Sequence, residues 1–340
     1  MKLVNFSIGG KARAGLSVDG VLYDIDQVLA SLREVKLFSK PRLLEGFERP
    51  VSVASLVAAG DQGIEALRCL EQHIRWVRDA GDPSVLRNAR VDGADARWLP
   101  PIEAPELFYG IGGNSPLFFR DKGFQIPAYP RGFQRPASNH SLIGHNGRVN
   151  IPPTYSTMRA SAELGVVIGK PGKSIPAAKA MDHVFGYTLV NDMCSDSWKV
   201  IALDGKDERL MHEDITVFTA RASTSYYSRA TDTFAAVGPW IVTKDEVPDP
   251  YNLMVYNYLS GVLRERSYTQ AMVNGIEQTI AYLSRIFTLK PGMIIHMGTM
   301  GIDGYTIEPD MFLGPDDYFE IEYEKVGKLR CYVNDQRPKG

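Results

Sequence analysis

The pattern of hydrophobic and polar positions divides the chain into a mixed first part and a β-rich remainder. In the first part, two or three short strands precede a segment with apolar residues at helical spacing: Ile64, Leu67, Leu70, Ile74 and Val77. This spacing predicts an amphipathic helix. We expect His73, which falls in the same segment, on the helix surface. Residues 1–98 are therefore predicted to form a small N-terminal α/β domain.

Beyond the prolines at 100, 101 and 105, short runs rich in β-branched and aromatic residues dominate. They predict strands within 147–153, 162–170, 185–192, 235–243, 251–267, 292–299 and 317–333. Helices are predicted only at 174–184 and at 275–289, where Ile276, Ile280, Leu283 and Ile286 share one face. The fold class is α+β and mostly β, with residues 99–340 as the second domain. The turn at 110–114 lacks the context of a dinucleotide-binding motif.

Composition and charge narrow the class of protein. Of 340 residues, 44% are hydrophobic and 23% are charged, with a net charge of -2, so we expect a folded core and neither a nucleic-acid nor a membrane partner. The chain has no apolar stretch of about 18 residues, and its start lacks the apolar block of a signal peptide. The cysteines Cys69, Cys194 and Cys331 are odd in number and far apart, which favours reduced thiols and a cytoplasmic location.

Two acidic residues stand at the ends of predicted buried strands. Glu163 precedes the apolar run of one strand, and Asp192 ends the next one. If these strand ends meet, the carboxylates converge and can hold Mg²⁺ or Mn²⁺, which would polarise a carbonyl group and stabilise an enolate. The alternative is that both are solvated acids at strand ends, which are common.

Further side chains are candidates for chemistry. Arg229 is suited to bind a substrate carboxylate through its two-pronged guanidinium group. His296 precedes the turn Gly298–Thr299, whose backbone N–H groups suit an oxyanion. His212 lies in a strongly polar stretch, so it is either a base or ligand, or part of a surface loop.

Three other residues have a weaker claim. His140 and His145 flank a polar turn, where a histidine is either a general base or, more commonly, solvated. Cys194 would be a nucleophile only with a base beside it, and a buried inert thiol is the simpler interpretation.

Several short motifs in order resemble the fumarylacetoacetate hydrolase superfamily, over roughly residues 105–333. They are AELGVVIGK, GYTLVND, DTFAAVGPWIVT, TLKPGMIIHMGTMG and LGPDDYFEIEYEKVGKLRCYV. The resemblance implies a β-roll catalytic domain, a homodimer, and activity on a small 2-oxo or β-diketo acid. It also implies a divalent metal, Mg²⁺ or Mn²⁺, held by a Glu-x-Glu pair and an Asp, of which Glu163 and Asp192 are present here.

The sequence departs from this pattern at several positions. Ser161 replaces the first Glu of the pair, Arg229 replaces a lysine, and Phe118 stands where a water-activating histidine is often found. Other differences fall at Asp196, Ser197, Glu265 and Met293. By resemblance, Phe118, Ser161, Gly298 and Thr299 are expected to line the substrate pocket, with Arg229, His296 and His212 as the remaining catalytic candidates.

Three hypotheses therefore stay open. The first is a metal-assisted C–C hydrolase for a 2-oxo or β-diketo acid. The second is a non-hydrolytic relative, such as a decarboxylase, dehydratase, tautomerase or cyclase, because Phe118 cannot activate water. The third is a non-catalytic binding homologue. An arginine such as Arg229 inserted between Glu163 and Asp192 would replace the cation and predict a metal-free site.

Overall fold

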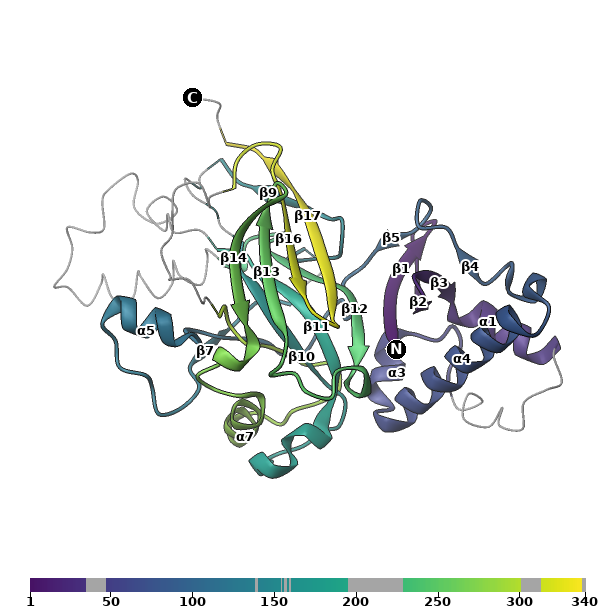
Figure 1. Ribbon diagram of the computed structural model, residues 1–340, viewed down its shortest axis with the longest axis horizontal. Coiled ribbons are helices and arrows are strands. Elements are labelled where there is room, and N and C mark those ends of the chain that lie inside the picture. Colours follow the sequence, from purple (N-terminus) through teal and green to yellow (C-terminus); the bar gives the residue numbers. More distant parts are fainter. Residues whose placement is uncertain are drawn as a thin grey trace.

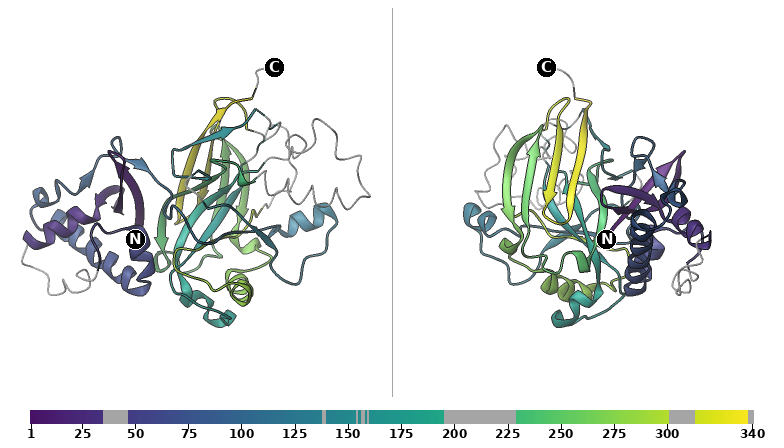
Figure 2. Two further views of the ribbon diagram at one scale, coloured as in Figure 1. Left: turned by 180° about the vertical axis from the view of Figure 1, so that it is seen from behind. Right: turned by 45° about the vertical axis from the view of Figure 1, so that its right-hand side comes forward.

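The computed structural model describes residues 1–34, 47–137, 140–153, 155, 158, 160–194, 229–300 and 313–337. His212, Asp196 and Ser197 lie outside these residues. Figure 1 shows a helix-containing N-terminal lobe beside a larger lobe of long strands, and Figure 2 shows the same two lobes from other sides. None of the helices in the described part of the chain is both long and apolar enough to cross a membrane.

The helices are α1 (Ile25–Glu34), α3 (Val53–Ala58), α4 (Asp61–Asp79), α5 (Pro116–Lys122) and α7 (Ile276–Ile286), with 3₁₀ turns η1 (Pro83–Leu86), η2 (Ala177–His183), η4 (Lys244–Glu246) and η5 (Thr269–Ala271). The strands of the N-terminal part and its connection are β1 (Lys2–Ile8), β2 (Lys11–Val18), β3 (Val21–Asp24), β4 (Arg90–Val91), β5 (Arg97–Trp98), β6 (Phe108–Ile111) and β7 (Gly132–Gln134). The remaining strands are β8 (Leu142–Ile143), β9 (Arg148–Ile151), β10 (Ala162–Ile168), β11 (Val184–Asp192), β12 (Ala235–Thr243), β13 (Met254–Leu259), β14 (Val262–Tyr268), β15 (Ile294–His296), β16 (Tyr318–Tyr323) and β17 (Gly327–Asp335).

Two sheets organise the described residues. The larger sheet has the order β4-β3-β2-β1-β12-β11-β10-β15-β6-β7, with β5 paired to β1 and β8 paired to β12. The smaller sheet has the order β14-β13-β16-β17-β9 and packs over the middle of the larger one (Figure 1). The mostly β, α+β fold class expected from the sequence is confirmed.

The central strands β10 and β11 are buried along their whole length because they are covered on both faces. On one face, Leu164 and Val166 join the core that contains the smaller sheet. On the other face, Val167 and Val190 join the core of the N-terminal helices. Coverage on both sides explains why these strands read as continuous apolar runs rather than as an alternation.

The N-terminal lobe is tied to the larger lobe through a shared sheet. Strand β1 pairs antiparallel with β12 through Lys2 opposite Val242 and Leu3 opposite Ile241. The predicted helix of this lobe is α4, and its apolar residues are buried as expected. The sheet continues from one lobe into the other, so the boundary between residues 98 and 99 stays a prediction.

The structure corrects several details of the sequence interpretation. His73 is fully buried on α4, where its Nε2 lies 3.3 Å from the hydroxyl of Ser31, so it is not a surface histidine. The predicted helix at 174–184 contains a 3₁₀ turn. Ile286 ends α7 and is 55% exposed, because the helix face turns away from the core at its last residue. The short helix α5, which follows the 110–114 turn, was not predicted.

Candidate active site

Glu163 and Asp192 lie on the same face of the β10–β11 pair, at the same end of both strands. Glu163 is opposite Val190, and Asp192 comes two residues later on β11. Side chains two residues apart on a strand share a face, so the two carboxylates point to one side of the sheet. Ser161 comes two residues before Glu163, and its carbonyl accepts the N–H of Asp192 at 3.1 Å, so position 161 lies beside Asp192 on the same side. The convergence expected from the sequence is therefore present.

The Glu163 carboxylate is buried and held by two donors. Its Oε2 lies 2.5 Å from Nδ1 of His296 and accepts the N–H of Gly298 at 3.0 Å. Burial lowers the pKa of His296, against an opposing effect of Glu163, so we assign a neutral imidazole that donates its Nδ1–H. Oε1 accepts no hydrogen bond from the described residues and is left for a ligand.

His296 lies behind Glu163 rather than in the cavity. Its side chain is fully buried, and its Nε2 has no hydrogen-bond partner among the residues described. The ring packs edge-to-face with Phe133 and approaches Gly110 so closely that a Cβ there would lie 2.2 Å from the imidazole. His296 can therefore orient Glu163, but it cannot reach a substrate directly.

The Asp192 carboxylate is surrounded by arginines. Its Oδ1 accepts a hydrogen bond from Nη1 of Arg135, and its Oδ2 lies 3.5 Å from Nε of Arg229. Arg135 is 1% exposed, and its Nη2 donates to the carbonyl oxygens of Arg229 and Phe234 at 2.7 and 2.9 Å. Burial and the nearby Arg229 lower the pKa of Arg135 to about 9, which still leaves the group protonated at neutral pH.

A small cavity of about 60 Å³ opens beside these carboxylates. Its lining residues are Ile111, Gly112, Gly113, Phe118, Phe133, Ser161, Glu163, Asp192, Cys194, Arg229 and Thr299. The guanidinium carbon of Arg229 lies 4.7 Å from the centre of the Phe133 ring, so this arginine is stacked against the cavity wall. The volume is well below the roughly 300–1,000 Å³ of drug-sized pockets and suits the head group of a small acid.

Two hydroxyl groups complete the polar part of the cavity. Ser161 Oγ and Thr299 Oγ1 lie 2.6 Å apart, and the N–H of Ser161 donates to the side-chain carbonyl of Asn191 at 2.8 Å. Ser161 is thus bonded through both its backbone N–H and its hydroxyl. A hydroxyl pair can hydrogen-bond a carbonyl or enol oxygen without adding charge.

The donor set does not fit a divalent metal. Among the described residues, no group of three His, Cys, Asp or Glu side chains is placed to hold an ion. Ser161 supplies only a neutral hydroxyl, and both Asp192 oxygens face guanidinium groups. Hard cations such as Mg²⁺ and Mn²⁺ need carboxylate oxygens that are free of other cations.

The structure thus brings together most of the residues expected at the site. Phe118, Ser161, Glu163, Asp192, Arg229 and Thr299 all line the cavity. Gly298 is not among the lining residues, and its N–H donates to Glu163, so it is not left for a substrate oxyanion. Cys194 is buried, as expected, and lines the cavity. His212 falls outside the described residues.

Sequence reasoning missed Arg135 and Phe133. Both lie in or just after the three-residue strand β7, and Arg135 is fixed there by its own N–H, which donates to the carbonyl of Phe108 at 2.8 Å. Nothing in the segment GFQRPAS indicates that the arginine after β7, an edge strand of the larger sheet, reaches Asp192. The arginine beside a proline in a predicted connection was the only available signal.

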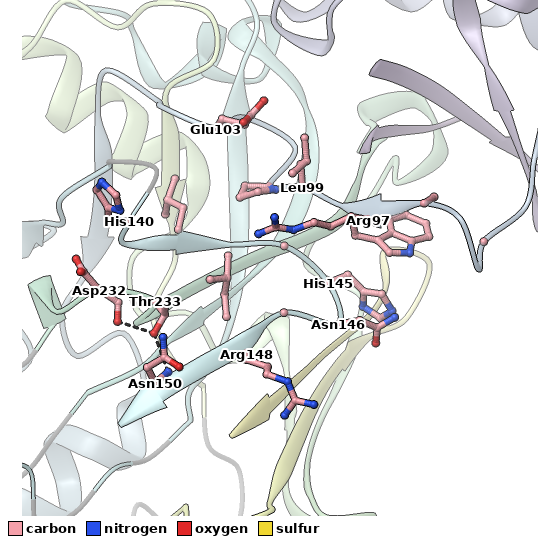
Figure 3. Close-up of a pocket in the computed structure, with 18 residues that line it drawn as sticks. Arg97, Leu99, Glu103, His140, His145, Asn146, Arg148, Asn150, Asp232 and Thr233 are labelled. Atoms are coloured by element: carbon pink, nitrogen blue, oxygen red, sulfur yellow. Dashed lines mark hydrogen bonds between the residues drawn. The ribbon is translucent and has the colours of Figure 1, made fainter. Parts of the chain in front are cut away.

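A second and larger cavity of about 880 Å³ lies elsewhere, between the two lobes (Figure 3). Arg97, Arg148, Glu103 and Asp232 contribute charges of both signs to its lining. His140 and His145 line it too, so neither histidine stands at the Glu163–Asp192 site. The smaller cavity differs in that the buried acids Glu163 and Asp192 line it together with Arg229.

Comparisons with known proteins agree with this fold. An uncharacterized protein from Staphylococcus aureus strain USA300 is 28% identical over 336 residues, covering 98% of this chain and 99% of that protein. Maleylpyruvate hydrolase from Sphingobium sp. SYK-6, solved with manganese(II) and pyruvate, superposes with a TM-score of 0.65 at 23% identity, covering 98% of this chain and 99% of that one.

The structure of 5-carboxymethyl-2-hydroxymuconate delta-isomerase from Mycobacterium smegmatis is also similar, with a TM-score of 0.62 at 21% identity, covering 99% of this chain and 100% of that one. The model of the family described as fumarylacetoacetate (FAA) hydrolase C-terminal matches residues 109–334, which is more than half of the chain. The chain therefore belongs to the fumarylacetoacetate hydrolase superfamily.

Proposed function

We propose that this protein is an enzyme that moves a proton next to the keto group of a small 2-oxo or β-diketo acid. The observation that carries the proposal is the small cavity in which the buried carboxylate of Glu163 meets the guanidinium group of Arg229. A carboxylate held without a metal is a suitable base for carbon acids, and an arginine at the same cavity binds a carboxylate.

Each residue then has a role. Arg229 binds the carboxylate of the substrate, stacked on Phe133. Glu163 takes a proton through Oε1 from the carbon beside the keto group; the electron pair of that C–H bond forms the C=C bond of an enolate, and the π pair of the C=O bond moves to the keto oxygen. The hydroxyl pair Ser161–Thr299 hydrogen-bonds this oxygen. Glu163 then returns the proton to oxygen or to another carbon, which yields a tautomer or an isomer.

His296 and Gly298 are positioning residues in this account. Their N–H groups both end on Oε2 of Glu163 and fix the direction of Oε1. They do not touch the substrate. Fixing a base in advance lowers the cost of reaching the reactive geometry.

The lining of the cavity favours proton transfer over hydrolysis. No histidine lines it among the residues described, and Phe118 forms part of its wall. An apolar wall excludes the water that hydrolysis consumes and so protects an enolate from side reactions.

Hydrolysis of a C–C bond is the second candidate. It is supported by the similarity in fold to maleylpyruvate hydrolase, whose structure contains manganese(II) and pyruvate. For this chain it would need Glu163 rather than a histidine to activate water, because no histidine among the described residues lines the cavity.

We also propose that the protein assembles as a homodimer. This is implied by the family resemblance alone and is tested by light scattering.

The test is a panel of acylpyruvates and other 2-oxo acids, incubated with the protein in H₂¹⁸O and separately in D₂O. We expect deuterium at the carbon beside the keto group without cleavage. Incorporation of ¹⁸O into an acid fragment would favour the hydrolase. Binding of an acid with neither exchange nor cleavage would favour a non-catalytic homologue and contradict the proposal.

A further inference from the structure

The side chain of Arg135 is buried and makes several hydrogen bonds inside the protein. Its guanidinium group donates to the Asp192 carboxylate in one segment and to the carbonyls of Arg229 and Phe234 in another. Its backbone N–H is fixed to Phe108 as well. A side chain that is 1% exposed and bonded in this way has one position.

Charges at the site already balance. Among the described residues here, the carboxylates of Glu163 and Asp192 face the guanidinium groups of Arg135 and Arg229. Because Ser161 supplies no carboxylate, a divalent ion would leave this buried group with a net charge of +2.

A net positive charge of this size has a high free-energy cost in a buried site. An uncompensated buried ion costs several kcal/mol even after the protein relaxes. Displacing Arg135 would not avoid the cost, because its guanidinium group would then lose two carbonyl acceptors and its carboxylate partner. Binding of a divalent metal therefore carries a large free-energy cost, whether Arg135 stays in place or is displaced.

We infer that Arg135 is a built-in cation, whose guanidinium group occupies the place at Asp192 that a divalent metal would need. The site is therefore metal-independent, and residues 135 and 161 together decide this property. The inference rests on the proposed function only for the identity of the site. Its test reads metal binding rather than turnover, so the two can fail separately.

The first experiment measures Mn²⁺ binding to the purified full chain by calorimetry and by the electron paramagnetic resonance of free Mn²⁺. We expect no binding at one ion per chain, and a melting temperature that is the same with Mn²⁺ and with chelator. Binding of one Mn²⁺ per chain at micromolar concentration would overturn the inference. This measurement needs no variant.

The second experiment restores a metal site. The double variant Ser161→Glu/Arg135→Met adds a third carboxylate and removes the cation, so its affinity for Mn²⁺ should rise by at least about tenfold over the wild type. Ser161→Glu/Arg148→Met is the matched control, because Arg148 is an exposed arginine that lines the larger cavity and not the small one. It should gain little, since Arg135 still occupies Asp192.

The outcomes are distinct. A gain confined to the Arg135 variant supports the inference. A folded double variant, judged by circular dichroism, that gains no affinity would overturn it, and so would an equal gain in the Arg148 control. If the double variant does not fold, the wild-type measurement alone decides.

Discussion

The carboxylate of Glu163 and the imidazole of His296 form a fully buried pair, with Nδ1 of the histidine 2.5 Å from Oε2 of the acid. The pair crosses from β10 to β15, where Gly165 is opposite His296. The second donor, the N–H of Gly298, contacts the same oxygen. The two contacts to Oε2 therefore fix the direction in which Oε1 points. The predictions below follow from this arrangement and from the arginines beside it.

The first prediction concerns His296. His296→Leu removes a hydrogen bond to a charged group, which contributes about 1.5–3 kcal/mol, so kcat should fall by about 10- to 100-fold. KM should stay nearly unchanged, because His296 does not line the cavity. His296→Asn keeps a donor near the position of Nδ1 and should recover part of the loss. Equal changes in both variants would contradict the positioning role, and steady-state kinetics measure it.

Arg229 tests the binding of the substrate carboxylate. Arg229→Met should lower kcat/KM by roughly 100-fold, since a hydrogen-bonded charge pair contributes a few kcal/mol. The same change should have little effect on the methyl ester of the substrate, which carries no charge. Equal losses for acid and ester would show that Arg229 acts only through Asp192. Arg148→Met, at an exposed arginine, is the control.

Gly298 tests the turn that donates to Glu163. It has φ +78°, and a Cβ there would lie 2.7 Å from the carbonyl oxygen of Ile111. Gly10 has the same φ of +78° but nothing within 4 Å of such a Cβ. Both replacements by alanine carry the strain of positive φ, about 1–2 kcal/mol, and Gly298→Ala should cost more. Equal losses of unfolding free energy in urea would contradict this contact.

His145 tests pH dependence away from the active site. Burial and the nearby Arg330 lower the pKa of His145 to about 4, and its Nδ1 accepts the N–H of Arg330 at 3.1 Å. Glu320 acts in the opposite direction. The unfolded chain therefore binds a proton near pH 6.5 that the folded chain takes up only near pH 4.

Stability should accordingly be complete above about pH 6.5 and fall by at most about 3 kcal/mol between pH 6.5 and 4. His145→Asn keeps an acceptor but does not titrate, so its melting temperature should fall less over this range. His140→Asn, at an exposed histidine, is the control and should follow the wild type. A profile of His145→Asn as steep as that of the wild type would contradict the assignment.

Local patterns in the sequence predicted many elements of the fold. The apolar runs of β10 and β11 are covered on both faces, and the helical spacing in α4 is a buried face, so both were readable without the structure. His73 was misplaced because periodicity does not show that α1 also packs on α4 and offers Ser31. The exposure of Ile286 likewise depends on where α7 leaves the core.

The sequence also predicted part of the site, because some of its residues lie on neighbouring strands. Glu163 and Asp192 end neighbouring strands, so their convergence followed from chain order. Arg135 comes from a strand at the far end of the sheet, and its partner is more than fifty residues away in sequence. The sequence hypothesis allowed an arginine to replace the cation, but named Arg229, whereas Arg135 makes the buried contact.

The central claim is that Glu163 is a base that works on an oxo acid without a metal. The most direct measurement is the exchange of the proton beside the keto group into D₂O, followed by ¹H NMR, for wild type and Glu163→Gln in the presence of chelator. Glutamine can still accept the N–H groups of His296 and Gly298, so the fold should persist while exchange falls by about 10²–10⁴-fold. Exchange that requires added Mn²⁺, or that proceeds equally in Glu163→Gln, would contradict the account.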